Sequence, residues 1–217
     1  MDYEHDLFIS YRRQEDWTPW TRQHLGRLLR AYLQQELQRP PDIFIDEHLE
    51  VGKNWVNDLA EHLAKSRVMV AVFSADYFSS PWCLHELDLM LERWKPAGAA
   101  NPVLIFPIVA HDGELIPATI QRLQTPDIKR FRIAGLIRDT PLYQDFSQCV
   151  NGFAPGLAKL IQSAPPFDAK WIKHHQTRLN KVFDAWHLGQ GKIQPTKQFK
   201  LPLPQLTTKP PRPEPEF

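Results

Sequence analysis

Hydrophobic and polar positions follow two alternating spacings over roughly the first 165 residues of the chain. Short, continuous apolar runs rich in β-branched residues are typical of strands that are buried on both faces. Such runs occupy residues 6–11, 43–46, 67–73 and 103–109, and a weaker fifth strand is expected within 130–136. Between the runs, apolar residues recur every three or four positions, which is the spacing of an amphipathic helix. These helices are expected to begin near Pro19, Trp55, Leu84 and Phe146.

Strands that alternate with helices favour a parallel sheet with right-handed crossovers. We therefore predict an α/β fold of the flavodoxin-like type, in which a five-stranded parallel sheet carries helices on both faces. The closing helix, over residues 146–161, is expected to be interrupted near Pro155, because a proline inside a helix removes one backbone hydrogen bond. In sheets of this kind, binding sites lie at the carboxyl ends of the strands.

Three segments of the chain differ in composition. Residues 1–165 hold the α/β pattern, which Pro165-Pro166 ends. Residues 166–190 are predicted to form an appended amphipathic helix, with the helical spacing running over 168–188. Its apolar side must be buried, either on the domain or against a partner; it consists of Trp171, Ile172, His175, Leu179, Val182, Phe183 and Trp186. Residues 191–217 form a Pro-rich linker or tail, which could precede a further domain.

The formal net charge of +1 is unevenly distributed along the chain. Residues 168–217 carry nine Lys/Arg and four Asp/Glu, whereas residues 1–167 carry 17 and 21. Such a mildly basic tail is more typical of a solvated segment than of nucleic-acid binding. No apolar run approaches the ~20 residues of a membrane span, and the first residues lack the pattern of a signal peptide. We therefore expect a cytoplasmic protein without a membrane partner.

The two cysteines, Cys83 and Cys149, do not make a disulfide framework, which fits a reducing compartment. Neither cysteine lies near a histidine at ligand spacing, and the nine histidines show no metal-binding pattern, so no metal site is expected. The chain also lacks a Gly-rich phosphate loop and a GxGxxG run, which argues against a retained dinucleotide cofactor.

Polar residues follow three of the predicted strands. Ser10-Tyr11-Arg12-Arg13 follows the first strand, Asp46 to Lys53 follows the second, and Ser74 to Glu86 follows the third and leads into a helix. Because the carboxyl ends of parallel strands meet at one edge of a sheet, these segments are expected to converge on one cleft.

The same segments resemble the TIR (Toll/interleukin-1 receptor) domain family. The resemblance covers about residues 5–163 and is carried by four stretches in the family's order, 6–13, 43–53, 66–74 and 80–87. The family includes NAD⁺-cleaving enzymes of bacteria, plants and animals as well as non-enzymatic adaptors. The pattern Trp82-Cys83-x-x-Glu86 and the run Tyr11-Arg12-Arg13 resemble the enzymatic members, whereas receptor adaptors tend to lack the glutamate.

The resemblance implies an NAD⁺ hydrolase or ADP-ribosyl cyclase of an immune or stress-response pathway, such as antiphage defence. It implies that Glu86 is the catalytic carboxylate and that NAD⁺ is a substrate rather than a cofactor. Cleavage of the nicotinamide–ribose bond builds positive charge on the ribose, which one carboxylate can stabilise. Nicotinamide leaves as a neutral ring, so no general acid is strictly needed. The substrate-binding residues expected around Glu86 are Ser10, Tyr11, Arg12, Arg13, Asp46, Trp82 and Cys83.

Two of these side-chain types have an evident use in binding NAD⁺. Trp82 could stack on a ring of the substrate, and Arg12 or Arg13 could bind its pyrophosphate. Purely structural roles stay open for these residues, since a tryptophan is usually buried in a core and arginines are usually surface charges.

The resemblance also implies self-association through TIR–TIR contacts. Family members complete the cleft with a neighbour's loop, and the residues expected in this assembly loop are Leu49, Gly52, Lys53 and Trp55. The main alternative to an enzyme is a non-enzymatic TIR scaffold that acts through such contacts alone. A phospho-receiver domain is disfavoured, because the strand ends lack its acidic cluster and its phosphorylatable aspartate. The sequence leaves open whether the product is ADP-ribose or a cyclic form, what activates the protein, and its oligomeric state.

Overall fold

The computed structural model describes residues 2–14, 16–46, 55–94, 103–111 and 125–187. Within these residues a parallel sheet has the strand order β2-β1-β3-β4. The strands are β1 (His5–Tyr11), β2 (Ile43–Ile45), β3 (Ser66–Phe73) and β4 (Ile105–Val109). The prediction of an α/β fold with a parallel sheet is therefore confirmed, and the first four predicted strands are found close to their expected positions.

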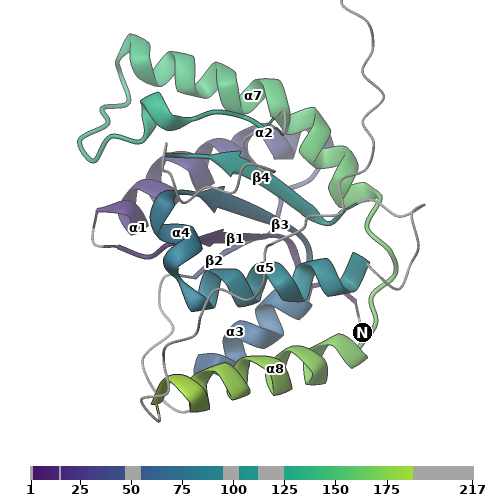
Figure 1. Ribbon diagram of the computed structural model, residues 1–217. Helices are drawn as coiled ribbons and strands as arrows, with labels where there is room; N and C mark the ends of the chain where they lie inside the picture. Colours follow the sequence, from purple (N-terminus) through teal and green to yellow (C-terminus); the bar gives the residue numbers. More distant parts are fainter. Residues whose placement is uncertain (1, 15, 47–54, 95–102, 112–124, 188–217) are drawn as a thin grey trace, which may run out of the picture.

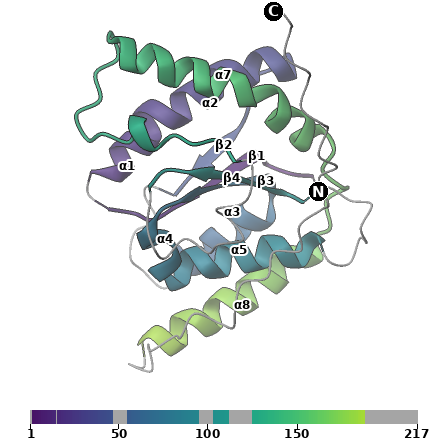
Figure 2. The same cartoon turned by 45° about the horizontal axis from the view of Figure 1, so that its top comes forward.

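Helices cover both faces of this sheet (Figures 1 and 2). One face carries a nearly continuous helical stretch and one long helix: α1 (Trp17–Trp20), the π-helical turn η1 (Thr21–Gly26), α2 (Arg27–Leu37) and α7 (Pro141–Gln162). The other face carries α3 (Trp55–Ala64) and α5 (Pro81–Trp94). The short helix α4 (Ala75–Ser79) follows the carboxyl end of β3. Finally, α8 (Lys170–His187) lies outside α3 and α5 as an additional layer (Figures 1 and 2).

The apolar strands are buried on both faces because each one feeds two cores. Successive side chains of a strand point to opposite faces of the sheet. Leu7 and Ile9 accordingly pack with the α2 and α7 side chains, whereas Phe8 between them packs with those of α3 and α5. This arrangement explains why β1 and β3 appear as continuous apolar runs rather than as alternating ones. Among the described helices, none has both the length and the apolar character required to cross a membrane.

The predicted fifth strand over 130–136 is wrong. The chain runs parallel to β4 for a single bridge, Val109 with Asp127, and then turns into a 3-10 helix, η3 (Lys129–Phe131). Phe131 is buried, but Ile133 and Ile137 are 45% and 67% exposed. These apolar residues therefore do not share one buried face, which an extended strand on the sheet would require.

The predicted interruption of the closing helix near Pro155 is also wrong. Helix α7 begins five residues earlier than predicted and continues through Pro155 to Gln162. It begins with Thr140 as its N-cap, whose Oγ1 accepts a hydrogen bond from the Tyr143 amide, and with Pro141 in the first turn. The buried apolar face of α7 holds the helix together across a proline that costs about 3 kcal/mol.

Helix α8 is docked on the domain through its apolar side. Leu179 is 0% exposed and belongs to the core cluster formed by α3 and α5, and Phe183 packs on Trp55 with ring centroids 6.0 Å apart. Polar contacts flank this apolar seam: Arg178 donates to Glu92 and to Asp88 on α5, at 2.7 and 3.0 Å. The middle of the apolar side of the helix, with His175, Leu179 and Val182, is thus buried on the domain itself.

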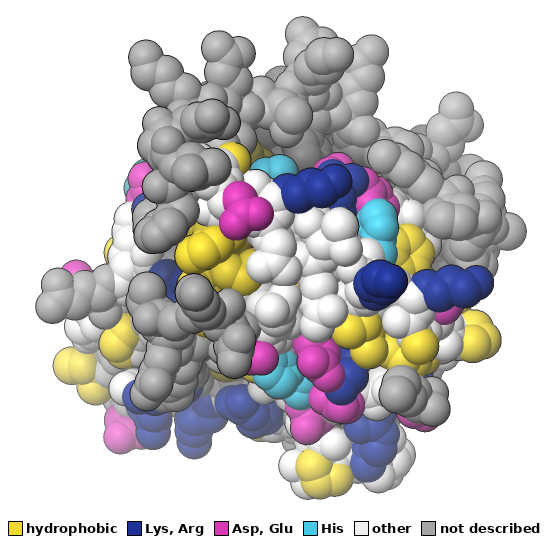
Figure 3. Space-filling model, turned by 90° about the horizontal axis from the view of Figure 1, so that it is seen from below, with side chains coloured by type: hydrophobic (Ala, Val, Ile, Leu, Met, Phe, Trp, Pro, Cys, Tyr) yellow, Lys and Arg dark blue, Asp and Glu magenta, His cyan; other side chains and the backbone are white. Residues whose placement is uncertain are grey.

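The residues of α8 that face away from the domain are charged or polar: Lys173, Thr177, Lys181 and Asp184 are exposed. Figure 3 views the molecule from below, the side on which α8 lies in Figure 1, and there basic and acidic side chains are interspersed. This pattern fits a helix with one buried stripe and one solvated face.

Leu179→Ala is expected to destabilise the chain by about 2 kcal/mol, near the lower end of the range for a buried leucine, because a helix at the surface can shift to fill part of the cavity. The matched control is Lys181→Ala on the exposed side of the same helix, which should change stability by less than about 0.5 kcal/mol. Urea unfolding measures both values. An unchanged midpoint for Leu179→Ala would mean that α8 does not pack on α3 in solution.

Candidate active site

The three polar segments at the strand ends converge on one pocket. Tyr11 to Arg13 come from the end of β1, Asp46 follows β2, and Ser80 to Glu86 begin helix α5 after β3 and α4. Helix α3 closes the pocket from the side. The lining residues are Tyr11, Arg12, Arg13, Asp46, Trp55, Leu59, Ser80, Trp82, Cys83 and Glu86.

Glu86 lies at the inner wall of this pocket, on the second turn of α5, and is only 5% exposed. The hydroxyl of Ser10, the last residue but one of strand β1, donates a hydrogen bond of 2.5 Å to Glu86 Oε2. The Tyr77 hydroxyl lies 2.9 Å from the same Ser10 oxygen and 3.3 Å from the Cys83 carbonyl oxygen. A buried network from α4 and β1 therefore fixes the carboxyl group in place.

The surroundings of Glu86 disfavour its charge. The pKa of Glu86 is raised to about 8, mainly by burial and also by the nearby Asp46, whereas the hydrogen bond from Ser10 and the charge of Arg13 act in the opposite direction. The carboxyl group is thus mainly neutral at pH 7 in the ligand-free pocket. A cationic group placed beside it would favour the ionised form.

Asp46 is a second buried carboxyl group in the same pocket. Desolvation raises its pKa, and Arg13 partly offsets this effect, with Nη1 3.5 Å from Oδ1. The Tyr11 hydroxyl donates to the Asp46 main-chain oxygen at 3.3 Å, and Arg12 Nη1 donates to Ser80 Oγ at 3.3 Å. Both arginines are exposed at the rim, above the two buried acids.

Two tryptophans form the apolar wall of the pocket. Trp82 is partly exposed, and its ring contacts Trp55 edge to face, with centroids 4.7 Å apart. Trp55, which is also expected in the assembly loop, is the first residue of α3 and is buried between Trp82 and Phe183. The other three assembly-loop residues, Leu49, Gly52 and Lys53, lie outside the described residues.

Cys83 lines the pocket, and its thiol is bound to the backbone of β1. Its Sγ donates to the Tyr11 carbonyl oxygen at 3.6 Å, and burial raises the pKa of the thiol far above its ordinary value. A neutral thiol of this kind is not a nucleophile.

Sequence reasoning missed three residues of the site: Tyr77, Ser80 and Leu59. Ser80 carried a signal, since a serine before Pro81 is a typical helix start, and its Oγ accepts from the Cys83 amide at 3.4 Å. Tyr77 and Leu59 gave no such signal. They reach the site only because α4 packs beside β3 and α5 and because α3 packs beside β1.

The pocket holds a cavity of about 40 Å³. Sites for ligands of drug size are about 300–1,000 Å³. In this conformation the site therefore admits a few water molecules, and a dinucleotide would require Trp82 and the rim arginines to move.

Comparison with known proteins gives one family. A family model described as a TIR domain matches residues 7–136. Among curated proteins, the chain is 35% identical over 105 residues to Disease resistance-like protein DSC1 of Arabidopsis thaliana, covering 48% of this chain and 8% of that protein. It is 50% identical over 65 residues to Protein PHLOEM PROTEIN 2-LIKE A8 of Arabidopsis thaliana, covering 30% and 18%. The chain thus spans less than a fifth of the length of either relative.

Among solved structures, the TIR domains of the activated Roq1 resistosome, which directly recognises the pathogen effector XopQ, match with 21% identity and a TM-score of 0.38. That match covers 84% of this chain and 99% of the other.

Proposed function

The chain belongs to the TIR domain family, and from this premise we propose that it is an NAD⁺ hydrolase or ADP-ribosyl cyclase that releases nicotinamide. The observation that carries the proposal is the position of Glu86, a buried carboxyl group held by Ser10 in the wall of a pocket at the carboxyl ends of the strands. This is where open parallel sheets bind their ligands.

The reaction breaks the bond between ribose C1′ and the nicotinamide nitrogen. The electron pair of this bond leaves with nicotinamide, which becomes a neutral ring, and positive charge builds on the ribose. A water oxygen then bonds to C1′ and loses a proton, giving ADP-ribose, or the adenine ring attacks and gives a cyclic product. The carboxylate of Glu86 stabilises the developing charge, and no second acid is needed for the leaving group.

The positive charge of the substrate favours the ionised form of Glu86. NAD⁺ carries its positive charge on the nicotinamide ring, and this charge beside Glu86 lowers the pKa of the carboxyl group. Substrate binding therefore ionises the residue that the reaction needs. In the same proposal, Trp82 stacks on a ring of the substrate, and Arg12 and Arg13 at the rim bind the pyrophosphate.

A second candidate function is a TIR scaffold without catalysis, and the small cavity favours it. Both functions include self-association, and for the enzyme we propose that contact with a neighbouring copy opens and completes the pocket. Two curated relatives bear names that refer to disease resistance, so we place either function in an immune or stress-response pathway.

Nicotinamide release is expected to depend on protein concentration. The 217-residue chain is incubated with NAD⁺ over a dilution series of at least a hundredfold, and free nicotinamide per protein molecule is measured alongside the molar mass from light scattering. If a neighbour completes the pocket, turnover per molecule rises with concentration in step with the oligomer.

The possible outcomes separate the two functions. Turnover that does not change with dilution in a chain that stays monomeric would contradict the requirement for assembly. Oligomers that release no nicotinamide at any concentration would leave the scaffold as the function of this chain.

A further inference from the structure

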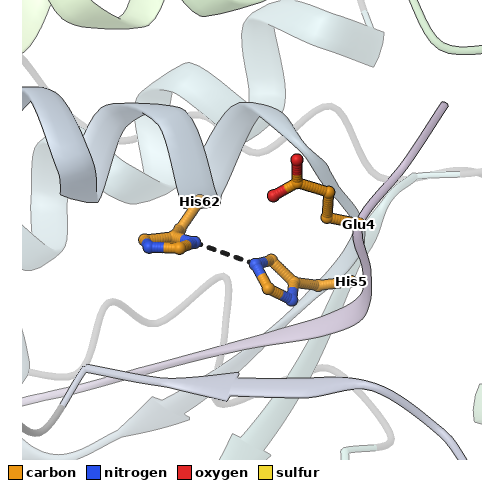
Figure 4. Close-up of side chains that lie close together, drawn as sticks. All are labelled: Glu4, His5 and His62. Atoms are coloured by element: carbon orange, nitrogen blue, oxygen red, sulfur yellow. Dashed lines mark hydrogen bonds between the residues drawn. The ribbon is translucent and has the colours of Figure 1, made fainter. Parts of the chain in front are cut away.

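A cluster of metal-binding side chains lies at the opposite edge of the sheet from the pocket. Glu4 and His5 stand at the beginning of β1, and His62 lies in the last turn of α3. One ligand atom from each residue lies within 4.8 Å of the other two, and the three side chains turn toward one another (Figure 4). We propose that Glu4, His5 and His62 bind a borderline divalent metal ion, with Zn²⁺ as the best-fitting ion.

The two histidines already approach the geometry that a metal ion requires. His5 Nε2 and His62 Nδ1 are 2.9 Å apart (Figure 4). Two nitrogen ligands at about 2.0–2.1 Å from a tetrahedral zinc ion lie about 3.3 Å apart. A separation increase of about 0.4 Å, together with transfer of the bridging proton from His62 Nδ1 to His62 Nε2, therefore converts the hydrogen-bonded pair into a pair of ligands. Glu4 supplies the third ligand atom, and water takes the fourth position, as in the sites with three protein ligands.

A second, independent observation is the orientation of His5. Its Nδ1 lies 2.6 Å from Asp42 Oδ1, and because a carboxylate only accepts hydrogen bonds, Nδ1 carries the proton. The lone pair of a neutral His5 is then on Nε2, the atom that faces His62. A carboxylate that orients a histidine in this way is the usual outer partner of a metal-binding imidazole.

The other groups around the cluster are compatible with a cation. Phe44 stacks on the His62 ring with centroids 4.1 Å apart and fixes its plane. Lys65 now contacts both Glu4 and Glu61, at 2.6 and 2.5 Å. When Glu4 turns to the metal ion, Lys65 retains Glu61 as its partner.

No short sequence motif indicates this site, because the two histidines are 57 positions apart and neither belongs to a short ligand motif. The fold brings them together where β1 starts and α3 ends. Borderline ions are favoured over Mg²⁺ and Ca²⁺, because two imidazoles and one carboxylate suit the former and all-oxygen sites suit the latter.

The test is calorimetric titration of ZnSO₄ into the full 217-residue chain after treatment with a chelator. Wild type is expected to bind one Zn²⁺ at its tightest site. His62→Gln and Glu4→Gln should weaken this site by about tenfold or more, and Asp42→Asn should weaken it by about 10–100-fold. The matched control is His111→Gln, an exposed histidine away from the cluster, which should leave the site unchanged.

Glu4 is exposed, so its substitution tests the proposal even if His62→Gln disturbs the stacking on Phe44. Thermal melts give a second readout, in which Zn²⁺ raises the melting temperature of wild type and of His111→Gln but not of His62→Gln or Glu4→Gln. No tight Zn²⁺ binding by wild type, or wild-type affinity in both His62→Gln and Glu4→Gln, would overturn the proposal.

Discussion

Glu86→Gln is expected to lower the rate of nicotinamide release by about 10²–10³-fold, the cost of removing one preorganised electrostatic contact to a transition state. Glutamine keeps the size of the side chain and can still accept the hydrogen bond from Ser10. What it loses is the negative charge that stabilises the cationic ribose. Nicotinamide release under saturating NAD⁺ measures the effect. Affinity for NAD⁺ should change much less, because in the proposed function Trp82 and the rim arginines of the pocket bind the rest of the molecule.

Two controls separate catalysis from folding. Glu36→Gln changes an exposed glutamate on α2 and should leave the rate unchanged. The second control compares the pH dependence of the free energy of unfolding of wild type and Glu86→Gln. Burial raises the pKa of Glu86 in the folded chain from 4.5 to about 8, so wild type loses stability as pH rises through this window. The Gln variant cannot ionise and should lose less stability over the same window. Wild-type turnover by Glu86→Gln would show that this site is not the catalytic one.

The first four strands and the convergence of three polar segments could be predicted from the sequence, because buried parallel strands are apolar throughout and their carboxyl ends share one edge. The fifth strand could not, since Phe131 and Ile133 have the spacing of a strand but the chain turns at Phe131. The continuation of α7 through Pro155 could not be predicted from helix propensity either, because burial of the apolar face of this helix outweighs the one missing backbone hydrogen bond.

The site shows the same division between local and long-range information. The motif around Glu86 could be identified from neighbouring residues, and the structure places Arg12, Arg13, Asp46 and Trp82 around it. Tyr77 and the role of Trp55 depend on how α4, α3 and α8 pack, which no short segment encodes. The charge state of Glu86 depends on its burial, which a sequence motif does not show. The motif alone predicts an ionised carboxylate, whereas the buried position in the pocket favours the neutral acid.

The activity is expected to rise with pH. If only ionised Glu86 supports the reaction, kcat/KM increases about tenfold per pH unit below the pKa of about 8 in the free protein and levels off above it. At pH 6 it should be roughly a hundredth of its plateau. The profile of kcat reports the complex with substrate, where the cationic ring lowers the pKa of Glu86. The kcat profile should therefore level off at a lower pH than the kcat/KM profile.

Two substitutions in the same pocket should move the kcat/KM profile in opposite directions. The charge of Asp46 raises the pKa of Glu86, so Asp46→Asn should shift the profile to lower pH. The hydrogen bond from Ser10 lowers the same pKa, so Ser10→Ala should shift the profile to higher pH. If the two substitutions merely loosened the pocket, both would lower the plateau of kcat/KM, and the two pH profiles would not shift in opposite directions. Shifts of the same sign, or a profile that is flat between pH 6 and 9, would mean that ionisation of Glu86 does not limit the reaction.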